Sequence, residues 1–387
     1  MSSPKVAGFA LWLFGLVAYA SVTAAAPAGK VLFAGGLGQD GNLALIYNGT
    51  NNKFAKKSKT MNAGRWYNTA TVLKNGKVLL IGATSAPNPP PGYPLPGYLS
   101  STELYNPHTG KFDKLKKTPT TSNPMFPGMS ATLLNNGRVL VISYFSLELY
   151  DTESNTFSGF EGSTLPTLRN GVTATAMSNG KVLLAGGTHI GQAMFDPDRV
   201  WNTAYLYDPA TNSFSNQAPS MNSPRTAASA IELNNGKVLI VGGSPFYPQS
   251  TPLASTELYD EASNSFAPES ALMNNARFGA AAVALTTGKV LIVCGEFTAS
   301  VSTELYDPAT NSFVTPSDTP VLNEARQFCT ATALGNGKVL VAGGGSASTE
   351  VYDPKTNTFS FGPDMSEAPQ SFSLYGAVWT TTATLLK

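Results

Sequence analysis

The chain has 387 residues, of which 42% are hydrophobic and only 13% are charged. Lys and Arg (25) nearly balance Asp and Glu (24), so the overall charge predicts neither nucleic acid nor an acidic membrane as a partner. The 36 Gly and 27 Pro, scattered among short apolar runs, are typical of an all-β protein with many turns.

Residues 1–26 differ from the rest of the chain. An apolar run at 6–20 follows a single Lys and precedes a segment of small residues, "SVTAAAPAG". This pattern predicts a secretory signal peptide, cleaved after Ala24 rather than Ala26 because Pro27 would follow the second site. An uncleaved anchor is the alternative, although the run is short for a spanning helix. We therefore expect an exported protein, secreted or periplasmic, with no transmembrane segment after cleavage.

Three short patterns recur along the chain. A Gly and a basic residue precede four or five apolar residues at 29–36, 76–82, 137–143, 180–187, 236–243, 288–295 and 337–344. A second pattern follows each copy and is most regular in "STELYDPATNSF" at 302–313. A strand rich in small residues, as in "NTATVLKN", precedes each of the last six copies. Self-similarity at spacings of 43 to 61 residues indicates a repeat architecture.

Each repeat predicts four short antiparallel strands, lettered a to d from the centre outward. Asn-Gly suits the tight turn between a and b, and Asp-Pro starts the turn between c and d. Four strands per repeat predict the blades of a β-propeller. The last segment, 380–387, matches the a strand at 68–74, so it is expected to complete the first blade. Residues 27–387 should then form one closed ring of seven blades.

The paired Gly after the b strand, the "ELYDP" strand and the seven-fold count resemble the kelch repeat family in its bacterial exported form. They also resemble the related propeller of galactose oxidase. The resemblance covers 29–387 and implies an all-β, seven-bladed kelch-type β-propeller with four-stranded antiparallel blades. It implies no single function, because kelch propellers serve as enzymes, glycan binders and protein-interaction modules.

Charged residues recur at two positions of the repeat. Arg precedes the a strand at Arg65, Arg169, Arg225, Arg277 and Arg326, with Phe126 and Val378 in the other two blades. Glu lies in the c strand at Glu103, Glu148, Glu257, Glu304 and Glu350, with Leu45 and Tyr205 in the others. Four blades carry both charges and the first carries neither, which favours buried ion pairs. Glu148 and Arg169, from neighbouring blades, are candidates for a pair across blades. The alternative is a ring of Arg around the channel mouth that binds an anion.

The connections between strands b and c predict a groove on one face. They are long at 83–100, 188–203 and 244–254 and short at 144–146, in the third blade. The residues expected to border the groove are Tyr93, Tyr98, Arg169, His189, Asp196, Asp198, Arg199 and Trp201. Aromatic rings with a few polar groups suit saccharides or extended peptides. The alternative is a set of Pro-rich loops without a binding role.

Residues suited to catalysis are few. A copper-radical oxidase like galactose oxidase needs two His, two Tyr and a crosslinking Cys around one metal. This chain has only His108, in a turn between c and d, and His189, in a connection on the opposite face. No other His or Cys cluster has metal-ligand spacing, so we expect no metal and no cofactor. Carboxylate catalysis stays open for Asp196, Asp198, Glu296 or Glu324, although no spacing singles out an acid and base pair.

The two cysteines are expected to lie at about the same height in neighbouring blades. Cys294 ends the b strand of the sixth blade, and Cys329 lies in the a strand of the seventh. The sequence leaves open whether they form a disulfide between blades or remain two small buried thiols.

A basic rim is predicted on the outer strands of the first two blades. Its residues are Lys53, Lys56, Lys57, Lys59, Lys111, Lys114, Lys116 and Lys117, against the single Asp113. This rim would attract an anionic polysaccharide or a membrane surface. The alternative is that Lys protects edge strands from pairing with other sheets.

The sequence therefore favours an exported, monomeric propeller that binds a glycan or an extracellular protein and is not an enzyme. The alternative is a carbohydrate-active enzyme, such as a lyase, epimerase or oxidase, on the same face. A third hypothesis is a surface adhesion protein that works through the Lys rim.

Overall fold

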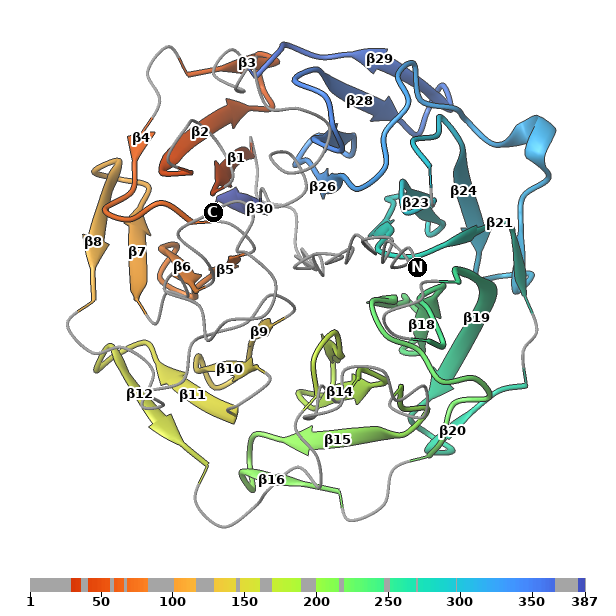
Figure 1. Cartoon of the computed structure of the whole chain (residues 1–387), viewed down its shortest axis with the longest axis horizontal. Coiled ribbons are helices and arrows are strands. Elements are labelled where there is room, and N and C mark those ends of the chain that lie inside the picture. Colours follow the sequence, from red (N-terminus) through yellow and green to blue (C-terminus); the bar gives the residue numbers. More distant parts are fainter. Residues whose placement is uncertain are drawn as a thin grey trace, which may run out of the picture.

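The strands of the chain stand in a ring of sheets around a central axis. A computed structural model describes residues 29–35, 41–55, 59–65, 68–82, 101–115, 129–143, 147–160, 169–188, 200–215, 219–246, 251–268, 271–296, 298–365 and 382–386. Their strands form seven antiparallel sheets, mostly of four strands, which follow one another around the ring in sequence order (Figure 1). The prediction of an all-β, seven-bladed propeller is confirmed.

The first four blades are formed as follows, from the axis outward. The first contains β30 (Thr382–Leu386), β1 (Lys30–Ala34), β2 (Leu43–Asn48) and β3 (Lys53–Phe54), and β4 (Lys59–Thr60) also pairs with β2. The second contains β5 (Thr69–Val72), β6 (Val78–Ile81), β7 (Thr102–Asn106) and β8 (Lys111–Lys114). The third contains β9 (Ser130–Leu133), β10 (Val139–Ile142), β11 (Leu147–Asp151) and β12 (Thr156–Gly159). The fourth contains β13 (Thr173–Ala176), β14 (Val182–Ala185), β15 (Ala204–Asp208) and β16 (Ser213–Phe214).

The last three blades repeat the plan. The fifth contains β17 (Ser229–Glu232), β18 (Val238–Val241), β19 (Leu253–Asp260) and β20 (Ser265–Phe266), and β21 (Leu272–Arg277) also pairs with β19. The sixth contains β22 (Ala281–Ala284), β23 (Val290–Val293), β24 (Thr303–Asp307) and β25 (Ser312–Phe313), followed by the short helix η2 (Pro316–Asp318). The seventh contains β26 (Thr330–Ala333), β27 (Val339–Ala342), β28 (Thr349–Asp353) and β29 (Thr358–Phe361). Within the described residues, no helix has the length and apolarity to cross a membrane.

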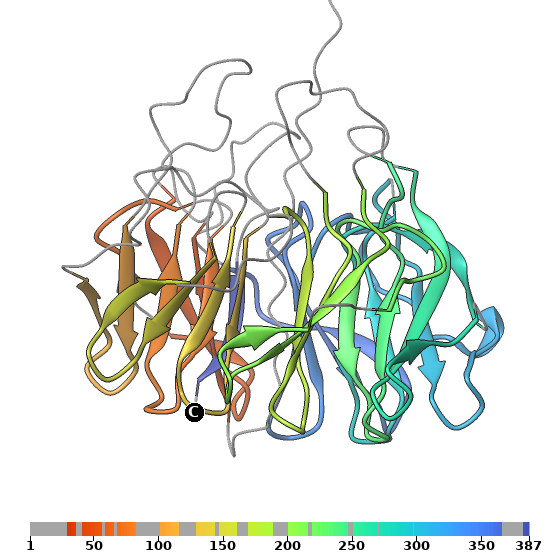
Figure 2. The ribbon, with the colours of Figure 1, turned by 90° about the horizontal axis from the view of Figure 1, so that it is seen from below.

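The strand ends define two faces of the ring. The turn face carries the tight turns between strands a and b, such as 73–77, and those between c and d, such as 307–312. The opposite loop face carries the connections from b to c and from d to the next a strand. Figure 2 shows the strands running between these two faces, with the C-terminal end of the chain at the turn face. The predicted groove would lie on the loop face.

The C-terminal strand closes the ring. β30 pairs antiparallel with β1, from Lys30 opposite Leu386 to Ala34 opposite Thr382. It also lies beside β26 of the seventh blade and β5 of the second. The prediction that the last segment completes the first blade is therefore confirmed, and the innermost strands form an unbroken circle. The unpaired edges of these inner strands face the axis of the ring.

The b strands are buried along their whole length because each lies between two neighbouring blades. All four residues of β6 are buried. Leu79 and Ile81 pack against the third blade, whereas Val78 and Leu80 pack against the first. Successive strand residues point to opposite faces, and here both faces are covered. This burial accounts for the continuous "VLLI" runs in place of an alternating pattern.

The repeated "ELYDPATNSF" segment forms the outer hairpin of each blade. In six blades the Tyr hydroxyl donates to the Oδ1 of an Asn five residues later, at 2.7–2.9 Å: Tyr47–Asn52, Tyr150–Asn155, Tyr207–Asn212, Tyr259–Asn264, Tyr306–Asn311 and Tyr352–Asn357. Each of these Asn residues has φ between 46° and 57°, a left-handed conformation that Asn tolerates. In all seven blades the Tyr ring packs on the Phe of strand d, with centroids 4.8–5.5 Å apart. The repetition is thus explained by a structural turn.

The buried Tyr residues predict a loss of stability in alkali. Burial, with the nearby Glu261 and Asp260, raises the pKa of Tyr259 to about 12, and burial beside Asp151 raises that of Tyr150 to about 12. These pKa values exceed the value of about 10 in the unfolded chain. The protonated Tyr residues therefore add to the free energy of unfolding in full below about pH 10, and this stabilisation is lost as the pH rises toward 12. We expect Tyr259→Phe to weaken the decrease in the free energy of unfolding between about pH 10 and 12, measured by denaturant titration at each pH. If the free energy of unfolding of the variant fell with pH as steeply as that of the wild type, Tyr259 would not be a source of the alkaline loss of stability.

Candidate functional site

Four buried ion pairs lie at equivalent places in four blades. They join Arg65 to Glu103 (2.9 Å), Arg225 to Glu257 (3.0 Å), Arg277 to Glu304 (3.6 Å) and Arg326 to Glu350 (3.4 Å). Both side chains of every pair have no exposed surface. Each pair lies within one blade, between the segment before strand a and strand c.

The guanidinium groups occupy a repeated socket. In five blades, Nη1 donates to the backbone carbonyl 17 residues later, at the end of strand b: Gly82, Gly186, Gly242, Cys294 and Gly343. Nη2 donates to a hydroxyl just before or at the start of strand c: Ser101, Thr203, Ser255, Ser302 and Ser348. Burial lowers the pKa of Arg65, Arg277 and Arg326, and the nearby Glu carboxylates oppose this shift. A buried Arg stays charged, and in these three blades the Glu offsets the loss of its hydration.

The same Glu residues also hold the connection between blades. Glu103 accepts hydrogen bonds from the backbone and side-chain nitrogens of Asn62 (both 2.8 Å) and from the backbone of Ala63 (3.0 Å). Equivalent bonds join Asn222 and Ser223 to Glu257, Asn274 and Asn275 to Glu304, and Asn323 and Glu324 to Glu350. The sequence interpretation missed these Asn residues. In the sequence, each of the four Asn that bind Glu through their side chains directly follows a Met or Leu and lies three residues before the Arg.

These contacts support structural ion pairs over an anion site. The five Arg side chains are at most 2% exposed, and protein oxygens already accept from their Nη groups. Glu148 and Arg169, the candidates for a pair across blades, are not joined by any of the ion pairs found among the described residues. Arg169 instead donates to Thr203 of its own blade, at 2.8 Å to the carbonyl and 2.6 Å to the hydroxyl.

The fourth blade replaces the carboxylate with aromatic rings. Tyr205 lies opposite Leu184 in strand c, at the position that Glu257 has in the fifth blade. The Arg169 Cζ lies 5.0 Å from the centroid of the Tyr205 ring and 5.2 Å from that of Trp201. Burial lowers the pKa of Arg169 to about 10, and Tyr205 opposes the shift. A cation held over two rings is stabilised by their negative faces.

Trp201 combines a fixed backbone with a partly exposed ring. Its N–H donates to the Gly187 carbonyl (2.9 Å), and its carbonyl accepts from the Arg225 N–H (3.2 Å). The side chain is partly exposed, while its indole Nε1 is buried and meets no hydrogen-bond acceptor in the described structure. A ring, a cation and an N–H group therefore lie together at the loop end of the fourth blade. We call Arg169, Trp201 and Tyr205 the aromatic site.

Most of the predicted groove lies outside the described residues. Of its proposed border, Tyr93, Tyr98, His189, Asp196, Asp198 and Arg199 fall there, while Arg169 and Trp201 are described and lie together. In the basic rim, Lys56, Lys57, Lys116 and Lys117 also fall outside, whereas Lys53, Lys59, Lys111 and Lys114 are described. The structure adds Tyr205, which the sequence interpretation named only as a substitution for Glu.

A cavity of about 430 Å³ opens on the turn face among the turns of the fifth to seventh blades. Apolar residues such as Leu233, Leu285 and Leu334 form much of its wall. Its carboxylate, Glu232, accepts a hydrogen bond from the backbone N–H of Ser178 at 2.7 Å. No catalytic residue proposed from the sequence lines it, because the short Asn-Gly turns that surround it carried no functional signal.

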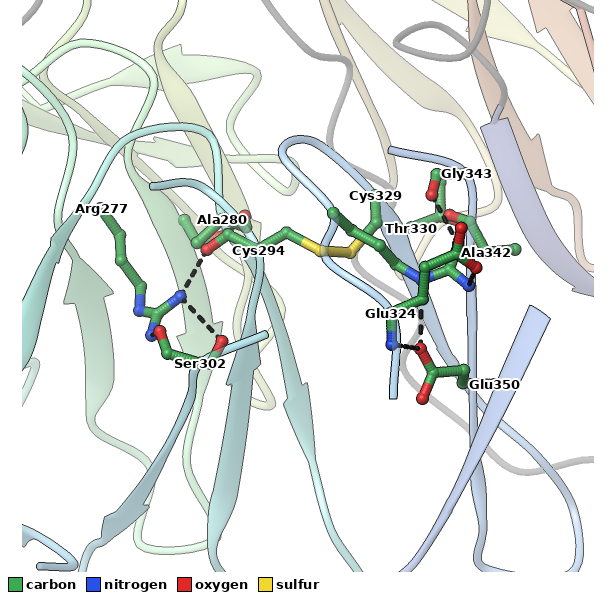
Figure 3. The surroundings of a disulfide bond; sticks show 12 residues. Arg277, Ala280, Cys294, Ser302, Glu324, Cys329, Thr330, Ala342, Gly343 and Glu350 are labelled. Atoms are coloured by element: carbon green, nitrogen blue, oxygen red, sulfur yellow. Dashed lines mark hydrogen bonds and ion pairs between the residues drawn. A yellow bond between two sulfur atoms is a disulfide. The ribbon is translucent and has the colours of Figure 1, made fainter. Parts of the chain in front are cut away.

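A disulfide joins the sixth and seventh blades. Cys294 and Cys329 are bonded, with Cα atoms 6.0 Å apart, which is one of the two alternatives left open by the sequence. Cys294 has φ of 59° and occupies the position of Gly186 and Gly242 in earlier blades. A Cβ at those glycines would point at the backbone of the next blade's Arg, so the same direction carries the Cys294 sulfur toward the seventh blade (Figure 3). The Cys294 carbonyl still accepts from Arg277 at 2.7 Å.

The described residues do not fit the copper site of a galactose oxidase-like enzyme. Both cysteines are joined to each other, so neither sulfur is available for a crosslink to Tyr. His108 is exposed in a turn on the turn face, whereas the aromatic site lies at the loop end. Among the described side chains, no group of three or more His, Cys, Asp or Glu could hold a metal ion.

Comparison with known proteins supports the fold. A kelch motif model matches residues 328–366. Among solved structures, the chain is similar to a novel fungal alcohol oxidase of the AA5 family in complex with copper, with a TM-score of 0.60 and 18% identity over 81% of this chain and 68% of that chain. It is also similar to YjhT, with a TM-score of 0.55 and 13% identity over 77% of this chain and 97% of that chain. No curated protein matches the chain. At these identities the likeness shows the fold alone.

Proposed function

We propose that this propeller is a non-catalytic binding module that recognises a glycan or an extracellular protein through its loop face. The observation that carries the proposal is the aromatic site, where Trp201 and Tyr205, the residue at the strand c position of Glu257, flank Arg169. At the strand c position five blades have Glu and the first has Leu45, whereas the fourth has Tyr205, with Trp201 four residues earlier. This departure from the repeat supports the fourth blade as the place of ligand binding.

The chemistry of the aromatic site favours a glycan. The apolar face of a sugar ring packs on an aromatic ring, and the Trp201 ring is partly exposed. An extended segment of an extracellular protein is the second ligand class, because aromatic-lined sites also bind such segments.

Export to an oxidising compartment is part of the proposal. The N-terminal pattern at 1–26 supports it, although these residues lie outside the described part of the chain. The Cys294–Cys329 disulfide adds support, since such bonds persist mainly outside the reducing cytosol. The innermost strands lie side by side around the axis, so their unpaired edges face the inside of the ring and not another copy, which favours a monomer.

Replacing Trp201 by Ala tests the aromatic site. We expect the variant to bind a neutral or acidic glycan about tenfold to a hundredfold more weakly than the wild type, because a buried aromatic anchor is lost. Binding to immobilised glycans is the measurement. The control is Phe361→Ala, which removes an aromatic ring that is 59% exposed on outer strand β29. Equal affinities for wild type and Trp201→Ala would place the ligand elsewhere.

A further inference from the structure

The charges of the chain are divided between two parts of the ring. Residues 29–117, which form most of the first two blades, contain 12 Lys or Arg and 3 Asp or Glu. Residues 118–387 contain 12 Lys or Arg and 21 Asp or Glu. The near-neutral total therefore conceals a net charge of +9 in the first part and −9 in the second. Such an asymmetry creates a local field that the overall balance hides.

On the turn face, the first two blades lack an ion pair that other blades have. A basic residue before strand b meets an Asp at the end of strand c in four blades: Arg138–Asp151 (3.3 Å), Lys237–Asp260 (3.0 Å), Lys289–Asp307 (3.2 Å) and Lys338–Asp353 (2.9 Å). Asn48 and Asn106 occupy the Asp position in the first two blades, opposite Lys30 and next to Lys77. Neither Lys forms an ion pair within the described structure.

The outer strands of the same two blades add further lysines. The residue before the strand d Phe is Thr or Ser in the last five blades: Thr156, Ser213, Ser265, Ser312 and Thr358. Lys53 and Lys111 take this position in the first two blades, and both are exposed. Lys59 lies on β4 and Lys114 lies on β8, and these two strands are neighbours on the outside of the ring (Figure 1). We call Lys30, Lys53, Lys59, Lys77, Lys111 and Lys114 the Lys surface.

Protection of sheet edges does not account for the Lys surface. The outer strands β12, β16, β20, β25 and β29 are edges of the same kind, and none contains a Lys. Edge protection also gives no reason for Asn48 and Asn106, which remove acidic partners on the turn face. Both changes act in the same direction, since each raises the density of uncompensated positive charge on two neighbouring blades.

We propose that the Lys surface binds a linear anionic polysaccharide, at a site separate from the aromatic site. All six cations are Lys, which act as flexible point charges and suit a polymer of spaced charges better than bidentate recognition of a single phosphate or carboxylate. A membrane is less suited, because peripheral membrane binding also uses inserted apolar residues. The large exposed hydrophobic residues of the described chain are Phe246, Leu272, Val301, Val321 and Phe361, all outside residues 29–117.

The test uses polygalacturonate as the probe, with neutral dextran as the uncharged polymer. We expect binding to polygalacturonate alone, weakened at least about tenfold when NaCl rises from about 50 to about 200 mM. The triple variant Lys53→Gln, Lys111→Gln, Lys114→Gln should bind about tenfold more weakly. The matched control is Lys289→Gln, Lys338→Gln, Lys355→Gln, which changes the net charge equally in the acidic part and should bind like the wild type.

A second variant tests the turn face without removing any lysine. Asn48→Asp with Asn106→Asp introduces the carboxylates of the other blades beside Lys30 and Lys77, and should weaken polygalacturonate binding about tenfold while the thermal midpoint stays unchanged. Three outcomes would overturn the proposal. They are no binding to polygalacturonate, equal losses in the two triple variants, or tighter binding to phosphatidylglycerol vesicles than to the polymer. Salt-sensitive self-association that occupies the Lys surface would likewise assign it to a second copy of the chain.

Discussion

Replacing Glu257 by Gln is expected to lower the free energy of unfolding by about 3–5 kcal/mol, because it leaves the Arg225 guanidinium buried without its counter-charge. The same change weakens the bonds from Asn222 (2.8 Å) and Ser223 (2.9 Å) that hold the connection into the fifth blade. Urea denaturation of the wild type and the variant measures the difference. If the slope of the free energy of unfolding against urea concentration is the same for both proteins, they expose the same surface on unfolding and the difference is one of stability.

The control for this variant is a surface ion pair in the same blade. Lys237 lies 3.0 Å from Asp260, and their side chains are 38% and 32% exposed. Lys237→Ala should therefore cost at most about 1 kcal/mol, because solvent screens the exposed pair. Similar losses for Glu257→Gln and Lys237→Ala would contradict the view that burial makes the repeated Arg socket a main source of stability.

Removing the disulfide is expected to lower the free energy of unfolding by about 2–4 kcal/mol, since the bond closes a loop with a sequence separation of 35 residues in the unfolded chain. Of two double variants, Cys294→Gly, Cys329→Ala should lose less stability than Cys294→Ala, Cys329→Ala, because Gly adopts the φ of 59° found at position 294 without steric cost. The variant Cys294→Ala, Cys329→Ala should lose about 1 kcal/mol more, since Ala keeps the cost of the left-handed conformation.

Reductant provides the internal control for the disulfide. Dithiothreitol should lower the thermal midpoint of the wild type, measured after complete reduction in mild denaturant, and leave both double variants unchanged. If the Gly and Ala variants were equally stable, position 294 would not carry the backbone cost inferred from its neighbours in the repeat. If reduction had no effect on the wild type, the link between the sixth and seventh blades would contribute nothing to stability.

The architecture was predictable because its determinants are local and repeated. The Tyr and Asn of the outer hairpin lie five residues apart, and β30 repeats the pattern of β5 closely enough to identify its place in the ring. The Asn residues that bind Glu257 and its equivalents were missed, although they lie three residues before each Arg, because Asn is common in connections and by itself indicates only a turn. Their role appears only when the carboxylate is seen to face both them and the Arg.

The candidate site was predictable only in part. The sequence placed Arg169 and Trp201 on one face, but it offered Arg169 only a carboxylate, Glu148, as a candidate partner and overlooked the two rings. The error arose from treating charge as the only means of satisfying a buried Arg, whereas Tyr205 and Trp201 offer their ring faces. The loops that carry Tyr93, Tyr98, His189, Asp196, Asp198 and Arg199 have no repeated pattern, so no local rule fixes their conformation.

The most direct test of the central claim is to incubate the chain from Ala25 onward with neutral and acidic glycans, and to analyse bound and free material by mass spectrometry. A binding module retains at least one glycan with its mass and linkage unchanged, and the Trp201→Ala variant retains less of it. A retained or released glycan that had been cleaved, epimerised or oxidised would contradict the account and identify a carbohydrate-active enzyme. Complete absence of retention would contradict the glycan and leave an extracellular protein as the ligand of the loop face.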